Sequence, residues 1–137
     1  MNLLIIDDDS ICSFINTRVA QTCGAFEQIT SLHNGQDALD FFNDVCAGTT
    51  PAPDVILLDL NMPLINGFDF IKEFQKLPVP GKEKIEIVIL TSSEQAHDIE
   101  RARNLGVHHY LLKPLTVNHL QSTIFSLDKK LRGRRAQ

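Results

Sequence analysis

Three aspartates follow two apolar segments of the chain. Residues 55–58 are all apolar and run directly into Asp59. Residues 3–6 are also apolar and run into Asp7 and Asp8. Such uninterrupted apolar runs are typical of strands buried on both faces of a parallel sheet. Because open α/β sheets build their sites at the carboxyl ends of strands, the three carboxylates are expected to share one small space if these strands are neighbours.

Crowded carboxylates are costly without a positive charge nearby. Two like charges about 4 Å apart repel by roughly 4 kcal/mol at an effective dielectric constant near 20. Protons or a metal ion must relieve this repulsion. Oxygen ligands at strand ends favour a hard cation, so the sequence predicts a Mg²⁺ site, with Mn²⁺ as an alternative occupant.

The same acidic residues could instead be helix caps and turn formers. Asp9 or Ser10 fits that role, since either can cap a helix that begins there. For Asp7, Asp8 and Asp59 taken together, the position at two strand ends favours the metal site.

A hydroxyl and an ammonium group follow two further apolar segments. Thr91 comes after residues 85–90 and Lys113 after residues 110–112. Taken singly, they would be a turn residue and a surface lysine. Their common position at strand ends places them beside the carboxylates, where an aspartate can act as a nucleophile and form an aspartyl phosphate. Phosphoryl transfer needs mainly positioning and charge stabilisation, which a metal ion and Lys113 can supply.

The segments that must position these residues alternate between strands and helices. This alternation is typical of a parallel α/β sheet. The second strand is polar and therefore expected at an edge. The expected strands cover residues 2–7, 26–32, 55–59, 85–90 and 110–112.

Apolar residues in the helical segments recur at intervals of three and four, which predicts one apolar face per helix, turned to the core. Asn34 is expected to cap the second helix, and Gly24 and Gly106 to end the first and the fourth. The predicted faces are Ile11, Phe14, Ile15 and Val19; Ala38, Leu39, Phe42 and Val45; Phe68, Ile71 and Phe74; and Val117, Leu120, Ile124, Leu127 and Leu131.

The composition bounds the class of protein. With 137 residues, one domain is expected, and a net charge of −4 argues against general nucleic-acid binding. No apolar run approaches the roughly eighteen residues of a membrane span, and the first residues lack the pattern of a signal peptide. Three cysteines without CxxC spacing suit reduced thiols. We therefore expect a cytoplasmic protein with no membrane partner.

The last ten residues, 128–137, are basic. A solvated helix end whose cations complement the helix dipole is the expected role, and an anionic partner is the alternative. We separate this tail from a domain at residues 1–127.

The motifs, in this order and at these strand ends, resemble a known family. Each motif is weak alone, but together they extend over nearly all of residues 1–127. The chain resembles the CheY-like receiver domain of bacterial two-component response regulators. The residues that carry the resemblance are Asp7-Asp8, Asp59 with Met62-Pro63 and Gly67, Thr91, Tyr110 and Lys113-Pro114.

The resemblance implies a fold. It is the flavodoxin-like (βα)5 three-layer sandwich, with a parallel five-stranded sheet in the order 2-1-3-4-5. It also implies a cis bond between Lys113 and Pro114, although only about 5–6% of such bonds are cis.

The resemblance also implies a chemistry. Asp59 would accept phosphate from a sensor histidine kinase or a histidine phosphotransfer protein. Asp8 and Asp59 would ligate Mg²⁺ together with the backbone carbonyl of Asn61, while Asp7 would act mainly through water. Thr91 would hold phosphate oxygens, as would Lys113.

Two pairs of residues would control the signal. Thr91 and Tyr110 would form the switch, in which the hydroxyl moves toward the phosphate and the ring fills the vacated space. Asn61 and Ser93 would flank the path of the attacking water. Both are short and polar, which favours fast self-dephosphorylation.

Ten residues after Leu127 are too few for a DNA-binding output domain. We therefore expect a stand-alone receiver, a monomer or weak dimer, that binds a downstream target protein and is no turnover enzyme. The alternative within the same family is a phosphorelay intermediate that passes phosphate to a histidine phosphotransfer protein.

Two other classes of protein remain as alternatives. A haloacid-dehalogenase-like phosphohydrolase also uses a strand-end aspartate with magnesium, but it expects a second aspartate where this chain has Asn61. A flavodoxin needs a hydroxyl- and glycine-rich loop after the first strand. Here residues 7–9 are all acidic and would repel an anion.

Overall fold

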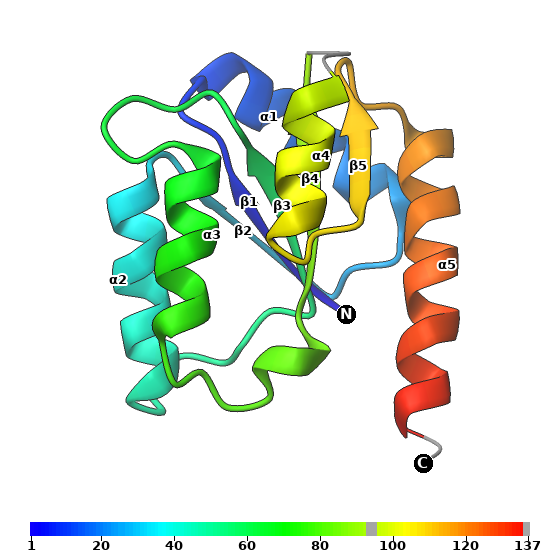
Figure 1. Cartoon of the computed structure of the whole chain (residues 1–137). Helices are drawn as coiled ribbons and strands as arrows, with labels where there is room; N and C mark the ends of the chain where they lie inside the picture. Colours follow the sequence, from blue (N-terminus) through cyan, green and yellow to red (C-terminus); the bar gives the residue numbers. More distant parts are fainter. Residues whose placement is uncertain (93–95, 136–137) are drawn as a thin grey trace.

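A parallel five-stranded sheet forms the centre of the molecule (Figure 1). The structure, a computed structural model, describes residues 1–92 and 96–135. The strand order is β2-β1-β3-β4-β5, which confirms the predicted flavodoxin-like order. The strands are β1 (Asn2–Ile6), β2 (Gln28–Leu32), β3 (Val55–Asp59), β4 (Glu86–Thr91) and β5 (His109–Leu112).

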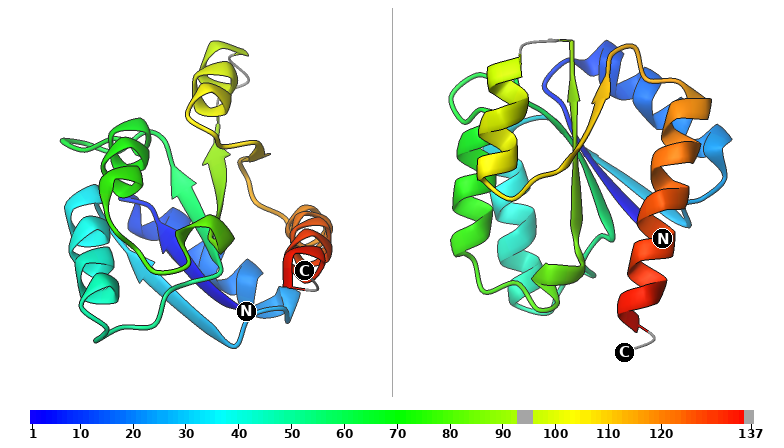
Figure 2. Two further views of the ribbon diagram at one scale, coloured as in Figure 1. Left: turned by 60° about the horizontal axis from the view of Figure 1, so that its bottom comes forward. Right: turned by 45° about the vertical axis from the view of Figure 1, so that its right-hand side comes forward.

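Helices cover both faces of this sheet, so the predicted three-layer sandwich is confirmed. α1 and α5 lie on one face, while α2, α3 and α4 lie on the other (Figure 2). A short 3-10 helix, η1 (Lys82–Lys84), precedes β4. The helices are α1 (Ser10–Cys23), α2 (Gly35–Cys46), α3 (Gly67–Lys76), α4 (Ala96–Asn104) and α5 (Val117–Arg135).

The apolar run before Asp59 is buried on both faces of the sheet, as predicted. Ile56 and Leu58 pack into the core under α2 and α3, whereas Val55 and Leu57 pack into the core under α1 and α5. The parallel register pairs Ile6 with Leu58, which brings the residues that follow these two strands to the same sheet edge.

Most predicted helix faces are confirmed. Leu39 and Val117 are half-buried, and the side chain of Leu131 lies outside the described residues. The predicted residues that are buried are Ala38, Phe42, Val45, Phe68, Ile71, Phe74, Leu120, Ile124 and Leu127.

The predicted face of α1 is wrong for three of its four residues, whereas Val19 is half-buried and packs against the core. Ile11, Phe14 and Ile15 are 71%, 66% and 47% exposed. The buried face of α1 instead carries Ser13, Asn16 and Ala20. Burying a polar side chain costs little when it is hydrogen-bonded, and the Ser13 hydroxyl forms a hydrogen bond with that of Ser31 in β2.

Helix caps fix the segments beside the carboxyl edge of the sheet. Asp9 caps α1, accepting hydrogen bonds from the N–H groups of Ile11 and Cys12. Asn34 caps α2 as predicted. At the start of α3, the side chains of Asn66 and Asp69 each accept a hydrogen bond from the other's backbone N–H, a capping box that sequence reasoning missed.

Remaining expectations concern the ends of helices and the cysteines. Gly24 and Gly106, with φ of 75° and 90°, follow α1 and α4 closely. The three cysteines form no disulfide. Among the described residues, no helix combines the length and the apolar character needed to cross a bilayer. The backbone of α5 continues to Arg135, and a boundary at residue 127 stays a prediction.

Candidate functional site

Asp7, Asp8 and Asp59 meet at the carboxyl edge of the sheet, as the sequence predicts. One carboxylate oxygen from each lies within 4.8 Å of the others. Asp7 and Asp59 are buried, whereas Asp8 is exposed to solvent. The cluster is therefore open on one side, through Asp8.

Lys113 provides positive charge beside this cluster. Its Nζ lies 3.5 Å from Oδ2 of Asp7 and 3.6 Å from Oδ1 of Asp59. Burial lowers the pKa of Lys113, but the neighbouring carboxylates of Asp59 and Asp7 outweigh it, so the pKa lies above its ordinary value. Lys113 is therefore cationic at neutral pH.

Asp59 is an unusual carboxyl group. Burial raises its pKa to about 6, against the opposing effects of the Asn61 N–H and of Lys113. The Asn61 N–H donates to Asp59 Oδ1 over 3.1 Å. A carboxylate with so costly a charge gains from any additional cation placed against it.

Gly67 lets the chain turn tightly behind Asp59. Its N–H donates to the carbonyl of Leu60 over 3.1 Å. A Cβ atom at Gly67 would lie 2.8 Å from both the Asp59 carbonyl oxygen and the Leu60 Cα, so no side chain fits there. The start of α3 is thus packed directly on the backbone of the acidic site.

Thr91 and Lys113 are held together at the ends of β4 and β5. The Lys113 N–H donates to the Thr91 carbonyl over 2.8 Å, and the Lys113–Pro114 bond is cis, as expected. Thr91 is buried. Tyr110, in the edge strand β5, is 46% exposed.

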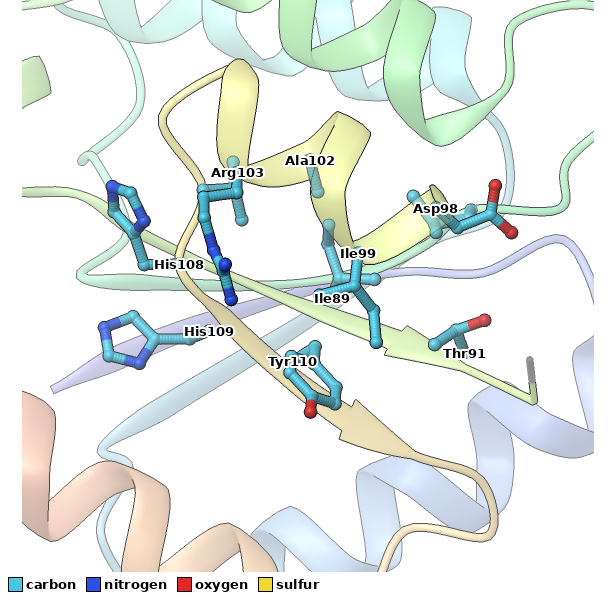
Figure 3. A pocket seen from close by; sticks show the side chains of 11 residues that line it. Ile89, Thr91, Asp98, Ile99, Ala102, Arg103, His108, His109 and Tyr110 are labelled. Carbon is cyan, nitrogen blue, oxygen red and sulfur yellow. The ribbon is translucent and has the colours of Figure 1, made fainter. Parts of the chain in front are cut away.

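A small pocket lies between α4 and β5, lined by both Thr91 and Tyr110 (Figure 3). Ile89, Ile99 and Ala102 form other parts of its wall. Its volume is about 10 Å³, comparable to the space for one water. The Tyr110 ring cannot enter this pocket unless the wall moves.

The family comparison agrees with this geometry. Residues 3–125 match the model of the response regulator receiver domain. The chain belongs to this family. Receivers are signalling domains of two-component systems, and a relative such as the response regulator SaeR of Staphylococcus aureus is 30% identical over 136 residues, 96% of this chain and 52% of SaeR.

Other relatives are similar to this receiver over most of its length. The probable methanogenesis regulatory protein FilR2 of Methanothrix harundinacea is 28% identical over 89% of this chain and 77% of its own length. The probable transcriptional regulator ycf27 of Cyanidium caldarium is 31% identical. The receiver spans about half the length of ycf27 and of SaeR.

Solved structures share the fold. A two-component response regulator from Cytophaga hutchinsonii superposes with a TM-score of 0.82 at 34% identity, covering 96% of each chain. The bacteriophytochrome response regulator RtBRR gives a TM-score of 0.78 at 26% identity, covering 92% of this receiver and 76% of RtBRR.

The donor atoms of this receiver fit a magnesium ion. Receiver domains bind Mg²⁺ through an acidic pocket, and the Asp7, Asp8 and Asp59 cluster supplies one. Asp7 Oδ2 is buried and accepts no hydrogen bond, and Lys113 Nζ lies 3.5 Å from it. Clustered carboxylate oxygens are the ligand type that Mg²⁺ prefers.

Two further site residues, Asn61 and Ser93, were predicted from the sequence. Asn61 lies on the exposed loop after β3, and its described contact is the N–H bond to Asp59. Ser93 lies outside the described residues.

Sequence reasoning missed the apolar rim on α1. Its exposed residues Ile11, Phe14 and Ile15 begin directly after the acidic loop. Beside them, a cleft of about 240 Å³ separates α1 from Lys113 and Pro114. The signal available in the sequence was the helical spacing of Ser13, Asn16 and Ala20, the small or polar residues that form the buried face of α1.

Proposed function

We propose that this receiver accepts a phosphoryl group on Asp59, in a magnesium-dependent reaction, from a histidine kinase or a histidine phosphotransfer protein. The observation that carries the proposal is the buried Asp59 carboxylate, which lies beside two further aspartates and the Lys113 ammonium. Such a site combines a nucleophile with the charge stabilisation that phosphoryl transfer requires.

In the transfer step, a carboxylate oxygen of Asp59 forms a bond to phosphorus while the bond between phosphorus and the donor histidine nitrogen breaks. The electron pair of that bond stays on the imidazole nitrogen, which takes up a proton. When bound, Mg²⁺ would neutralise charge on the phosphoryl oxygens. Asp8, Asp59 and the Asn61 backbone carbonyl would hold it, with Asp7 acting mainly through water.

Lys113 and Thr91 would then hold the phosphoryl oxygens of phospho-Asp59. The Lys113 ammonium already lies 3.6 Å from Asp59, so it can follow the new negative charge without crossing the site. Thr91 is buried and is the last residue of β4, the strand next to β3. Drawing it toward the phosphate would open the small pocket beside α4.

The Tyr110 ring would fill the space so opened and change the surface that a downstream target recognises. The phosphate shifts this equilibrium only by the contacts that differ between the two states. Tyr110 is the single tyrosine of a chain without tryptophan, so its fluorescence reports on this one ring.

Beryllium fluoride, which mimics an aspartyl phosphate, tests the proposal directly. We expect its addition with Mg²⁺ to shield Tyr110 from a soluble fluorescence quencher. Neither component alone should do so. Unchanged quenching at saturating concentrations of both would refute the switch.

The exposed rim of α1 would bind the protein that donates the phosphate. Ile11, Phe14 and Ile15 form an apolar surface directly after Asp7 and Asp8, which lie beside Asp59, where a donor histidine must approach. An exposed apolar patch rimmed by polar residues marks an interaction site. The same surface would serve a phosphorelay, because the reverse transfer needs the same approach.

Phe14→Ser should slow transfer from the protein donor by roughly tenfold or more, as for the loss of an aromatic anchor at an interface. Transfer from acetyl phosphate should be unchanged, because that donor needs no docking surface. Phe125→Ser, which removes another exposed phenylalanine from α5, is the matched control. Equal rates for the two variants with the protein donor would contradict the docking surface.

The lifetime of the phosphate would depend on Asn61 and Ser93. Asn61 is exposed beside Asp59 and leaves room for an attacking water. Asn61→Lys should lengthen the half-life of phospho-Asp59, since a long side chain shields the phosphorus. Decay of the labelled protein measures this, and an unchanged half-life would remove Asn61 from the account.

A further inference from the structure

The position of α4 depends on little apolar packing. Of residues 97–104, Ala102 alone is buried, and Ile99 is half-buried. Burial of an alanine contributes only a small hydrophobic stabilisation, since the gain scales with buried apolar area. In the left-hand view of Figure 2, α4 stands apart from α2 and α3. Other contacts must therefore fix the place of this helix.

Two contacts from α3 reach α4 and the residue after it. The guanidinium carbon of Arg101 lies 4.2 Å from the centre of the Phe68 ring, within the range of a cation–π contact. At the other end of α3, the Gln75 side-chain amide donates to the carbonyl of Leu105 over 2.5 Å.

The position of Phe68 depends on the acceptor loop, which is residues 60–66 between Asp59 and α3. It is buried in the first turn of α3 and follows Gly67, which packs on the backbone of Asp59 and Leu60. Leu60 in turn lines the pocket between α4 and β5. Arg101 is therefore stacked on a ring whose position is set by the acceptor loop.

We propose that Arg101 is a positioning residue that holds α4 in the unphosphorylated arrangement through its stack on Phe68. This inference rests on the proposed function. α4 forms one wall of the pocket of about 10 Å³, so a shift of α4 would enlarge the space that Tyr110 enters when Thr91 moves. A contact that is present in only one of two states stabilises that state. The stack of Arg101 on Phe68 therefore raises the concentration of phosphate analogue needed to switch the protein.

The test follows α4 and the switch separately. Amide hydrogen exchange of residues 97–104 is measured in protein without phosphate analogue. The beryllium fluoride concentration that half-shields Tyr110 is measured with Mg²⁺ present. Arg101→Gln should speed the exchange and lower the half-shielding concentration, each by about two- to fivefold, the range of one exposed cation–π contact.

Four further variants sharpen the test. Phe68→Leu, which keeps an apolar side chain without the π face, should reproduce Arg101→Gln, and the double variant should add nothing to either. Phe68→Tyr keeps the aromatic face and should behave as the unmodified protein. Arg18→Gln is the matched control, because the guanidinium carbon of Arg18 lies 5.9 Å from the centre of the Phe14 ring in α1.

Additive effects of Arg101→Gln and Phe68→Leu would overturn the proposal, as would an Arg101→Gln variant that matches Arg18→Gln. Faster exchange with an unchanged half-shielding concentration would overturn the role in switching while the proposed function stands. Unmodified protein that binds no beryllium fluoride would overturn the proposed function, and the switching role of Arg101 with it.

Discussion

Asp59→Asn protein is expected to take up no phosphate from acetyl phosphate or from a protein donor. The amide that replaces the carboxylate is not a nucleophile for phosphorus, and no other described carboxylate combines burial with contacts to both Lys113 and the acceptor loop. Incorporation of labelled phosphate measures the effect. Undiminished, acid-stable label on Asp59→Asn protein would contradict the assignment.

Loss of the fold should not explain this result. Burial raises the pKa of Asp59 to about 6, so the unfolded chain releases this proton at lower pH than the folded protein. The ionised carboxylate therefore opposes folding at neutral pH, and the opposition fades as the pH falls below about 6. Asp59→Asn should accordingly raise the thermal unfolding midpoint at pH 7.

Asp8→Asn is the companion variant. Asp8 is exposed and leaves the acceptor intact, so this variant should still be labelled on Asp59. The loss of one negative charge should raise the Mg²⁺ concentration needed for half-maximal rate. A magnesium dependence equal to that of the unmodified protein would exclude Asp8 as a ligand.

Lys113→Ala should separate phosphate uptake from signalling. Uptake should persist at a reduced rate, because Asp59 and the metal-binding oxygens remain. The switch should fail, since the ammonium that lies 3.6 Å from Asp59 would no longer couple the phosphate to the end of β5. We expect the phosphorylated variant to leave Tyr110 as open to quencher as the unphosphorylated protein.

Lys76→Ala is the control for this variant. Lys76 is an exposed lysine of α3 whose Nζ lies 3.2 Å from Glu73. The Lys76→Ala substitution therefore also removes a cation that forms an ion pair. Its phosphorylated form should shield Tyr110 normally. Full shielding in phosphorylated Lys113→Ala would show that the switch does not need this lysine.

The sheet and its acidic edge were predictable from the sequence because both depend on short-range patterns. An uninterrupted apolar run before Asp59 identifies a strand buried on two faces, and β3 is such a strand. Once the strands are parallel, their carboxyl ends share an edge. Asp7, Asp8 and Asp59 meet because β1 and β3 are also neighbours, an order that the family resemblance implied.

The buried face of α1 and the contact that positions α4 were not predictable in this way. Apolar spacing placed Ile11 and Phe14 in the core, but hydrogen bonding of Ser13 to β2 lets a polar face be buried instead. The stack of Arg101 on Phe68 joins residues far apart in the chain. Neither residue's type nor its spacing indicates that contact.

Identifying the residue that carries the phosphate tests the proposed function most directly. Protein treated with acetyl phosphate and Mg²⁺ is reduced with borohydride, which converts an aspartyl phosphate to homoserine, and its peptides are sequenced by mass spectrometry. We expect homoserine at position 59 alone, and none when the Mg²⁺ is chelated. Homoserine at another aspartate, or equal conversion of Asp59 without Mg²⁺, would contradict the account.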